Sequence, residues 1–548
     1  MLDRQAHDRL VDDVLAAFNA HDEAALKRLN EHYDRTFNFD DLWAEVWRRT
    51  YSFRQRAFRA PDQTLRPEEA QLLVAQDAGF GSWKAFAEAS ATGAPPVPAY
   101  MIDEVDSRIA PARVLSDSEW DDVIGVLRER RLRTFDPNGM LTDARLARIV
   151  ELDHVTALTL GGSRDLTDDG LLLLARMPQL ESLSLSEYPG GNLTDRGLEV
   201  LRQLPNLRRF EMTWQRGITD AGVANLKYCD ALESVDLMGT PTGDGAIEAL
   251  QGKARLTRFH SGKLVTDAGL RFLRSFPALR DLLIDGPFTD EGLASLAGLE
   301  VTDLDLFWHT TGITSDGFAR LAGLPKLESL GADGALTDNA AMRHIGALAK
   351  LRRLRAQESI ATDEGFEALS RSRTLENLWG RVCPNFGSRG FIALSAMPAL
   401  RGFGIGCKNV DDDALSRLPH FPALREITPI DFTDAGFRHI GRCARLERLT
   451  CMYCRETGDA ATAHIAGLPI RYYYAGLTQI TDLSLDIMGR MPTLEQIEFY
   501  ECNGITDAGL AFLAGLPKLR EIHLDGLPGV THAGTRVFPA RVRVKYST

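Results

Sequence analysis

The chain has 548 residues, of which 44% are hydrophobic and 25% are charged, as in ordinary folded proteins. This length exceeds what one hydrophobic core needs, so we expect either several domains or a repeat array. The net charge is −13 and no block of Lys and Arg forms the basic face that phosphate backbones require, so we expect no nucleic-acid partner.

Residues 1–92 predict a small all-α domain, because apolar residues recur there at helical spacing. The first stripe consists of Leu10, Val14, Leu15 and Phe18. Another helix is expected to begin at Pro67 and to end at Gly79. The segment 65–89 resembles a helical module that precedes ankyrin-type arrays in bacterial proteins, and this resemblance implies a bacterial source.

The N-terminal residues have acids where a secretory signal needs a basic start and an apolar stretch. No apolar run approaches the roughly 20 residues of a membrane span. We therefore expect a cytoplasmic protein without a membrane partner.

Residues 93–115 are rich in Pro and Ala, which predicts a linker. Residues 116–130 then predict an amphipathic helix that opens a third region, 116–548, with a degenerate first strand near Phe135. Residues 541–546 predict a polar edge strand that closes this region, since the exposed ends of an array need polar caps.

A Thr-Asp pair followed by Gly and an apolar residue recurs throughout the third region. The pairs begin at Thr142, Thr167, Thr194, Thr219, Thr266, Thr289, Thr337, Thr362, Thr433, Thr481 and Thr506. Degenerate copies lie between them, so the period is about 24 residues and the array holds about 17 repeats.

Each unit reads L-x-x-L-x-L, then T-D-x-G-L-x-x-L-x-x-L-P. The first half has the alternation of a short strand, and the second half has the spacing of a helix. The clearest copy runs from Leu494 to Pro517. Thr or Asp before the helix is an N-cap signal, and proline ends the helix.

This pattern resembles leucine-rich-repeat proteins, particularly the cysteine-containing and ribonuclease-inhibitor-like subclasses. The resemblance covers residues 130–540 and implies an α/β solenoid, a horseshoe with a parallel concave sheet and convex helices. It also implies that partners bind on the concave face.

Seven cysteines are too few and too irregular for a disulfide framework. Cys451-x-x-Cys454 has the spacing of a metal or redox motif. Within the repeat, however, Cys383, Cys454 and Cys502 occupy the strand-exit position at which this family places Asn or Cys, and Cys451 replaces a buried Leu. We therefore interpret these thiols as buried core groups.

The repeated aspartates suggest calcium binding or general acid catalysis, but helix capping explains them better. The sequence contains no phosphate-binding loop, zinc-protease helix or nucleophile elbow, and its histidines lack metal-ligand spacing. We expect no metal, no cofactor and no enzymatic activity.

Side chains that alternate with the buried strand residues should point away from the core. Those with the strongest binding potential form the predicted partner-binding set on the concave face and its rim. The set comprises Trp214, His260, Asp285, Asp305, Phe307, Trp308, Arg353, Arg355, Trp379, Arg381, Tyr472, Tyr474 and Tyr500. His260 beside acidic residues also raises a catalytic dyad as a remote alternative.

This set predicts an acidic zone, a basic zone and exposed aromatics, together with a bare strand at Gly402, Gly404 and Gly406. Since aromatics and Arg dominate interface energies, we expect a scaffold that binds a protein or peptide. Two alternatives stay open. One is an adaptor of the ubiquitin-ligase substrate-receptor type whose residues 1–92 recruit a second component, and the other is an enzyme or glycan binder. The sequence leaves the oligomeric state undetermined.

Overall fold

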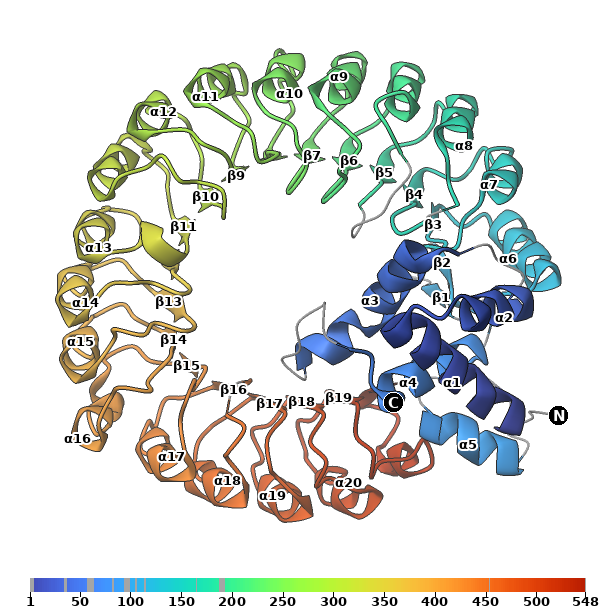
Figure 1. The fold of residues 1–548 in the computed structure, drawn as a ribbon. Coiled ribbons are helices and arrows are strands. Elements are labelled where there is room, and N and C mark those ends of the chain that lie inside the picture. Colours follow the sequence, from blue (N-terminus) through green and yellow to red (C-terminus); the bar gives the residue numbers. More distant parts are fainter. Residues whose placement is uncertain are drawn as a thin grey trace. The chain divides into compact units, whose positions relative to one another are not determined.

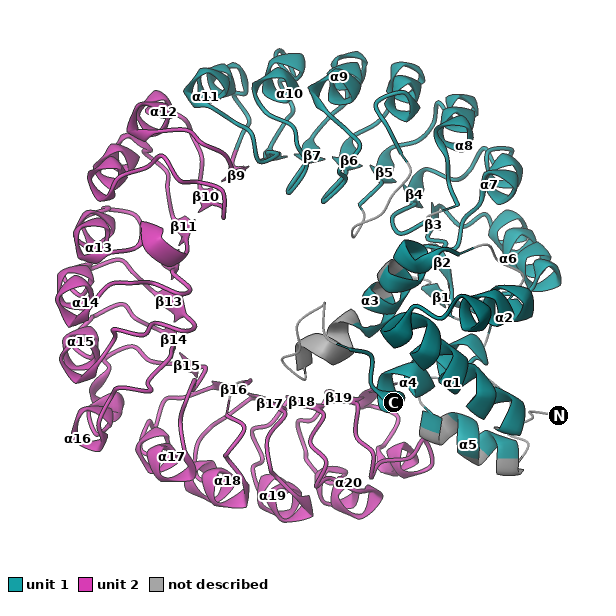
Figure 2. Cartoon of the chain, viewed as in Figure 1, with its two compact units in different colours: residues 1–279 teal, residues 280–548 magenta. Residues whose placement is uncertain are grey.

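The computed structural model describes residues 4–33, 37–56, 64–80, 83–92, 99–103, 106–112, 115–163, 165–186, 193–452 and 454–547. The chain divides into two compact units, residues 1–279 and residues 280–548 (Figure 2). The division falls inside the repeat region. Both units are built from the same strand-helix repeat, and the first also carries the N-terminal helices.

The N-terminal helices form a small hydrophobic core of their own. They are α1 (Arg4–Ala20), α2 (Glu23–Tyr33), α3 (Phe39–Arg56), α4 (Pro67–Asp77) and α5 (Trp83–Thr92). Leu10 and Val14 of the predicted stripe are buried in it. As expected, α4 begins at Pro67, and Gly79 follows its end with φ +84°, a left-handed conformation that glycine adopts easily.

The strands of unit 1 pair in chain order. They are β1 (Tyr100–Asp103), β2 (Arg108–Pro111), β3 (Thr134–Phe135), β4 (Ala157–Thr159), β5 (Ser182–Ser184), β6 (Arg209–Glu211), β7 (Ser234–Asp236) and β8 (Arg258–His260). Strands β1 and β2 form an antiparallel hairpin, and β2 to β8 pair in parallel.

The hairpin lies inside the segment that we expected to be a linker. Ile109 is fully buried, and β2 pairs with the first strand of the array, so this part of residues 93–115 belongs to the sheet. Residues 93–98 lie outside the described part of the chain. The Pro- and Ala-rich composition of residues 93–115 indicated the break between the helices and the repeats. It did not indicate the hairpin β1–β2 that caps the array.

Unit 2 carries one parallel sheet. Its strands are β9 (Asp281–Ile284), β10 (Asp303–Leu306), β11 (Ser329–Ala332), β12 (Arg353–Arg355), β13 (Asn377–Gly380), β14 (Gly402–Ile405), β15 (Glu426–Ile427), β16 (Arg448–Cys451), β17 (Tyr472–Gly476), β18 (Gln496–Tyr500), β19 (Glu521–Asp525) and β20 (Arg543–Ser547). Each strand pairs in register with its chain neighbour. The predicted terminal strand is confirmed as β20.

A helix follows nearly every strand. In unit 1 these are α6 (Asp117–Glu129), α7 (Asp143–Ile149), α8 (Asp168–Leu172), α9 (Asp220–Val223), α10 (Asp244–Ala249) and α11 (Asp267–Phe272). In unit 2 they are α12 (Asp290–Ser295), α13 (Asn339–Gly346), α14 (Asp363–Leu369), α15 (Ser388–Leu394), α16 (Asp412–Leu415), α17 (Asp434–Ile440), α18 (Asp459–Ile465), α19 (Asp482–Met488) and α20 (Asp507–Leu513). Short 3-10 turns complete or replace some of them, including Gly197–Gln203 and Ser315–Gly323. Within each unit the strands line the inner side of the curve and the helices its outer side (Figure 1).

This arrangement is a leucine-rich-repeat solenoid, an α/β fold with a small all-α N-terminal part. One copy shows why it forms. Ile497 and Phe499 of β18 and Leu510 and Leu513 of α20 are at most 1% exposed, so strand and helix bury their apolar sides against each other. A single unit cannot close this core, and stacking supplies the neighbours.

In most repeats the threonine of the Thr-Asp pair caps its own helix, as predicted, although Thr362 and Thr433 stand at the N-cap position without a side-chain hydrogen bond. Thr167, Thr314 and Thr506 accept a hydrogen bond from an N–H in the first turn of the helix or 3-10 turn that follows. In one repeat the cap lies a residue later than the motif indicates. There Asp338 caps α13, while Thr337 is buried and donates to the carbonyl of Gly334.

The aspartate has a different role from the one predicted, because it acts on the next repeat. Asp482 accepts the backbone N–H of Thr506 at 2.8 Å and its hydroxyl at 2.6 Å. The same pair of bonds joins Asp143 to Thr167, Asp168 to Thr194, Asp195 to Thr219, Asp244 to Thr266, Asp290 to Thr314, Asp459 to Thr481 and Asp507 to Thr531. We call this series the Asp-Thr ladder.

The ladder explains the glycine of the motif in most repeats, whereas after Asp459 the same position holds Ser484, whose hydroxyl donates to that carboxylate. A Cβ on Gly170, Gly317 or Gly509 would overlap the carboxylate that reaches over from the preceding repeat. Two natural replacements support this reason. Where Ser315 or Ser388 stands in place of the aspartate, the following repeat has Ala341 or Ala414 in place of glycine.

Candidate functional site

Outward-facing side chains form rows across the sheet of unit 2, because register pairing places equivalent residues side by side. The first row is Asp281, Asp303, Ser329, Arg353, Asn377, Gly402, Glu426, Arg448, Tyr472, Gln496, Glu521 and Arg543. The second row includes Asp305, Gly331, Arg355, Trp379 and Gly404, and continues through Thr450, Tyr474, Glu498, His523 and Lys545. The predicted alternation is therefore confirmed for these strands.

The predicted acidic and basic zones neutralise each other. Arg355 on β12 reaches across β11 to Asp305 on β10, with 2.7 Å between Nη2 and Oδ1, and it also pairs with Asp333. This crossing is possible because Gly331 leaves the intervening position empty. Arg353 makes the parallel crossing to Asp303 at 2.9 Å. The face therefore presents paired charges rather than two opposed zones.

Asp285 is wrongly placed in the predicted binding set, because its side chain is completely buried. Its carboxylate accepts the backbone N–H and the ring Nδ1–H of His309, both at 2.7 Å. Asp285 thereby holds the loop that presents Trp308, which is 69% exposed and stacks on Phe307 with 5.2 Å between ring centroids. Trp308 is exposed as predicted, whereas Phe307 is half-buried, and Asp285 supports the loop that carries both.

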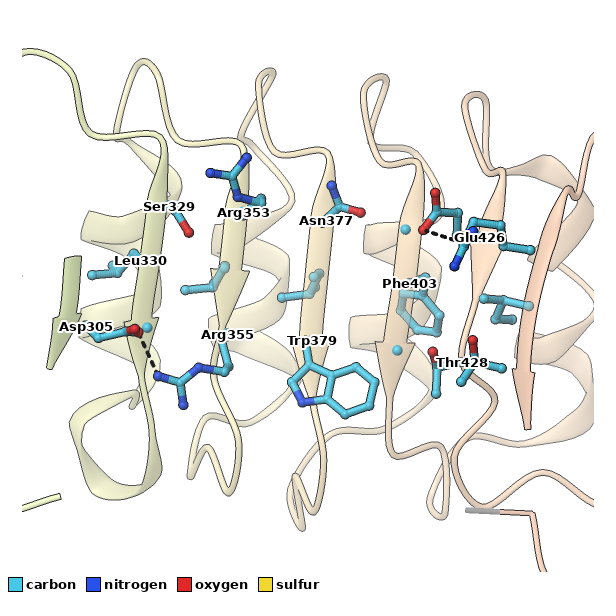
Figure 3. A pocket seen from close by; sticks show the side chains of 18 residues that line it. Asp305, Ser329, Leu330, Arg353, Arg355, Asn377, Trp379, Phe403, Glu426 and Thr428 are labelled. Atoms are coloured by element: carbon cyan, nitrogen blue, oxygen red, sulfur yellow. Dashed lines mark hydrogen bonds and ion pairs between the residues drawn. The ribbon is translucent and has the colours of Figure 1, made fainter. Parts of the chain in front are cut away.

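A shallow hollow of about 380 Å³ crosses β10 to β16. At Gly331, Gly402 and Gly404 the space of a side chain is taken by neighbours, namely the Asp305–Arg355 pair, Asn377 and Trp379. The ring of Trp379 extends over Gly404, where a Cβ would lie 2.8 Å from Cε3 of the indole. Figure 3 looks onto the sheet and shows this ring face-on between β13 and β14, and Trp379 is half-buried. We call the surface formed by Asn377, Trp379, Gly402, Gly404, Thr428 and Thr450 the Trp379 hollow.

Some of the residues that line the hollow were predicted as binding residues, and others were not. Asp305, Arg353, Arg355 and Trp379 all line it. Asn377, Glu426, Thr428 and Thr450 line it too and were missed, although they occupy the same outward positions of the repeat. Asn377, Thr428 and Thr450 are neutral and not aromatic, so neither charge nor aromaticity distinguishes them in the sequence. Arg381 follows β13 and is only half-buried.

The predicted tyrosines occupy the neighbouring strands β17 and β18. Arg448 lies over the ring of Tyr472, 3.9 Å from its centroid. Burial, and then the nearby carboxylate of Glu498, raise the pKa of Tyr472 to about 12, so its hydroxyl stays protonated at neutral pH. Tyr474 folds over Gly476, and Tyr500 is half-buried. These rings form a second aromatic patch, less exposed than Trp308.

Trp214 and His260 belong to unit 1. Trp214 has φ +62°, unusual for a bulky residue, and its ring lies against Gly239. His260 is largely buried and its Nδ1 lies 2.9 Å from Asp236, which is itself buried. Because this His-Asp pair is tied into the sheet and also contacts Arg258, it serves the strand interface.

The cysteine interpretation is confirmed, since all seven cysteines are buried and free. At strand exits, Cys454 donates to the carbonyl of Pro429 at 2.7 Å, and Cys383 and Cys502 donate to carbonyls of the preceding repeat. Burial raises the pKa of Cys443 to about 12 and that of Cys383 to about 11.

These shifts predict slow thiol chemistry. At about pH 8, a thiol with a pKa near 11 is ionised to roughly one part in a thousand, and the thiolate is the reactive form. We therefore expect the native protein to react with Ellman's reagent at none of its seven cysteines within minutes, and the guanidinium-unfolded protein to react at all seven. Rapid labelling of Cys451 or Cys454 in the native protein would contradict the buried role.

Within the described residues, no three His, Cys, Asp or Glu side chains gather in a way that could hold a metal ion. Among the helices of the described part, none is both long and apolar enough to cross a membrane.

Comparison with known proteins finds matches among solved structures only. No protein-family model and no curated protein matches it. Three solved structures that match are an internalin (inlF) from Listeria monocytogenes (16% identity, 70% of this chain and 88% of that chain, TM-score 0.32), the yeast Rad7 and Elc1 complex (17%, 78% and 88%, 0.34), and the TLR13–ssRNA13 complex (14%, 78% and 70%, 0.42). At these identities the likeness concerns the fold alone.

Proposed function

We propose that this protein is a non-enzymatic scaffold that binds a protein or peptide on the sheet face of unit 2. The observation that carries the proposal is the Trp379 hollow, where a half-buried indole and hydrogen-bonding side chains meet over the glycine positions of a parallel sheet. Buried aromatic anchors surrounded by polar groups dominate the energy of protein interfaces.

The charge pattern favours protein over nucleic acid as the partner. Arg353 and Arg355 are engaged by aspartates of the same sheet, and Arg448 lies 3.8 Å from Glu426. A nucleic-acid face needs cations free to displace counterions from phosphates. These ion pairs reduce that capacity and leave stacking and hydrogen bonding as the main forces.

Other features of the sequence enter the proposal as expectations. We assign the repeats to the cysteine-containing or ribonuclease-inhibitor-like subclass, since most repeats carry an outer α-helix and three carry a strand-exit cysteine. We also infer three regions, 1–92, 93–115 and 116–548, and a cytoplasmic protein of a bacterium. The N-terminal region keeps its resemblance to the module that precedes ankyrin-type arrays.

Partner capture with two matched triple variants tests the sheet-face assignment. The first, Trp308→Ala/Trp379→Ala/Tyr474→Ala, removes aromatics from the sheet face and its rim. The second, Ile392→Ala/Leu483→Ala/Phe512→Ala, removes exposed apolar residues from the outer helices of the same unit. We expect quantitative mass spectrometry to show partners lost with the first variant and kept with the second. Identical partner lists for wild type and the sheet-face variant would refute the proposal.

A further inference from the structure

The Trp379 hollow holds four polar side chains without a partner in the described part of the chain. The amide of Asn377, the Nε1–H of Trp379 and the hydroxyls of Thr428 and Thr450 make no side-chain hydrogen bond there, and all four side chains are half-buried. Partly buried polar groups gain when a ligand supplies the missing bond. The hollow therefore offers several donors to one ligand.

The charged groups around the hollow are, by contrast, already engaged. Arg355 lies between Asp305 and Asp333, and Arg448 stacks on Tyr472 while facing Glu426. A charged ligand would have to compete with these ion pairs and lose hydration in doing so. The surface is therefore complementary to a ligand that is uncharged but rich in hydrogen-bond acceptors.

The indole of Trp379 favours a ligand ring that can pack against it. Proline is uncharged, its pyrrolidine ring can pack on an indole, and it has a backbone carbonyl that accepts hydrogen bonds but no backbone N–H. Polyproline II segments keep their backbone free of internal hydrogen bonds, and aromatic-lined grooves commonly recognise them.

The spacing of the sheet matches such a segment. Neighbouring strands lie about 4.8 Å apart, so alternate strands are separated by about 9.6 Å. A polyproline II helix repeats every three residues, about 9.3 Å. Residues three apart in a segment crossing the strands would therefore match the spacing of alternate strands, as between Thr428 beside β15 and Tyr474 on β17.

We propose that the Trp379 hollow binds a proline-rich segment in the polyproline II conformation, with one proline stacked on Trp379 and another near Tyr474. This inference rests on the proposed function, since it names the chemistry of the peptide bound at the same face. It places the specificity of the scaffold in its neutral side chains.

Fluorescence anisotropy of a labelled decaproline peptide with the full chain tests the inference. We expect saturable binding that depends little on ionic strength, because the contact is neutral. A Gly-Ser peptide of equal length should not bind. Trp379→Ala should weaken decaproline binding about tenfold, the loss expected for one aromatic stacking contact.

Further variants separate stacking from a general loss of structure. Trp379→Phe should keep most of the affinity because the aromatic face remains. Gly404→Ala should weaken binding as Trp379→Ala does, because its Cβ would lie 2.8 Å from the indole and lift the ring from the strand. Trp308→Ala, outside the hollow, should bind as the wild type does. The urea midpoint of each variant verifies its fold.

Three results would overturn the inference. They are no decaproline binding, equal binding by wild type and Trp379→Ala, and Trp379-dependent binding of cellohexaose without decaproline binding, which would assign the hollow to a saccharide. If decaproline fails while partner capture still depends on the sheet face, only this inference is lost and the scaffold function stands. Capture that is insensitive to the sheet-face variant removes the function itself.

Discussion

Gly509→Ala is expected to destabilise the array by about 1–3 kcal/mol, although alanine is the better helix former. The added methyl group would overlap Oδ1 of Asp482 and push the carboxylate away from Thr506. Urea titration of the full chain should show a lower midpoint. Hydrogen exchange of the segment 505–513 should accelerate, because the N–H of Thr506 loses its acceptor.

The double variant Asp482→Ser/Gly509→Ala separates this mechanism from an effect of glycine alone. It copies the natural combination of Ser315 with Ala341, so we expect it to be more stable than the sum of the single changes by about 1–2 kcal/mol. Gly515→Ala is the matched control, because no atom lies within 4 Å of its added Cβ. Additive losses in the double variant would contradict the ladder mechanism.

Arg355→Leu is expected to cost about 2–3 kcal/mol, below the range for a fully buried pair because Arg355 is 33% exposed. The change leaves Asp333, with a side chain only 13% exposed, without its cation. Arg353→Leu is the control. Its ion pair with Asp303 is more exposed, at 49% and 41%, and should contribute less than 1 kcal/mol.

The destabilisation caused by Arg355→Leu should depend on pH, because Asp333 must be ionised for the loss of its cation to matter. Burial raises the pKa of Asp333, while Arg355 and the N–H of Gln357 oppose that rise. Removing Arg355 raises the folded-state pKa further above the unfolded value, so the penalty is complete above the folded pKa and shrinks as the carboxylate becomes protonated. The stability gap between wild type and Arg355→Leu should therefore narrow as the pH falls from neutral toward the unfolded pKa of Asp. A constant gap, or no rescue by Asp333→Asn, would refute the assignment.

Most of the fold follows from the sequence because its information is repetitive. Strand register, most helix caps and the buried cysteines follow from positions in one short pattern, and the terminal strand β20 follows from the alternation in residues 541–546. The hairpin β1–β2 does not, because it occurs once and its Pro- and Ala-rich surroundings are typical of a linker. The pairing of β2 with β3 occurs once, so the repeat pattern cannot predict it.

The candidate site was harder to predict than the fold. The alternation along a strand predicts which face of the sheet a side chain lies on, but not which side chains of neighbouring strands it contacts. It placed Arg355 and Asp305 on the same face, yet their contact depends on the empty position at Gly331 between them. The pattern also extended one residue too far at Asp285, where the chain leaves the strand and turns the carboxylate inward. Composition at a single position could not reveal these contacts between strands.

The Asp-Thr ladder gives the array a direction. Each aspartate acts on the repeat that follows it, as Asp459 does on Thr481 and Asp482 on Thr506, so every helix start in this series depends on its N-terminal neighbour. Removal of a repeat from the C-terminal side would leave only a carboxylate exposed to water. Removal from the N-terminal side would take away an acceptor that the next cap requires. A ribosome synthesises the array from its N-terminal side. If the repeats fold in that order, the aspartate that each capping threonine needs is already in place when the threonine folds.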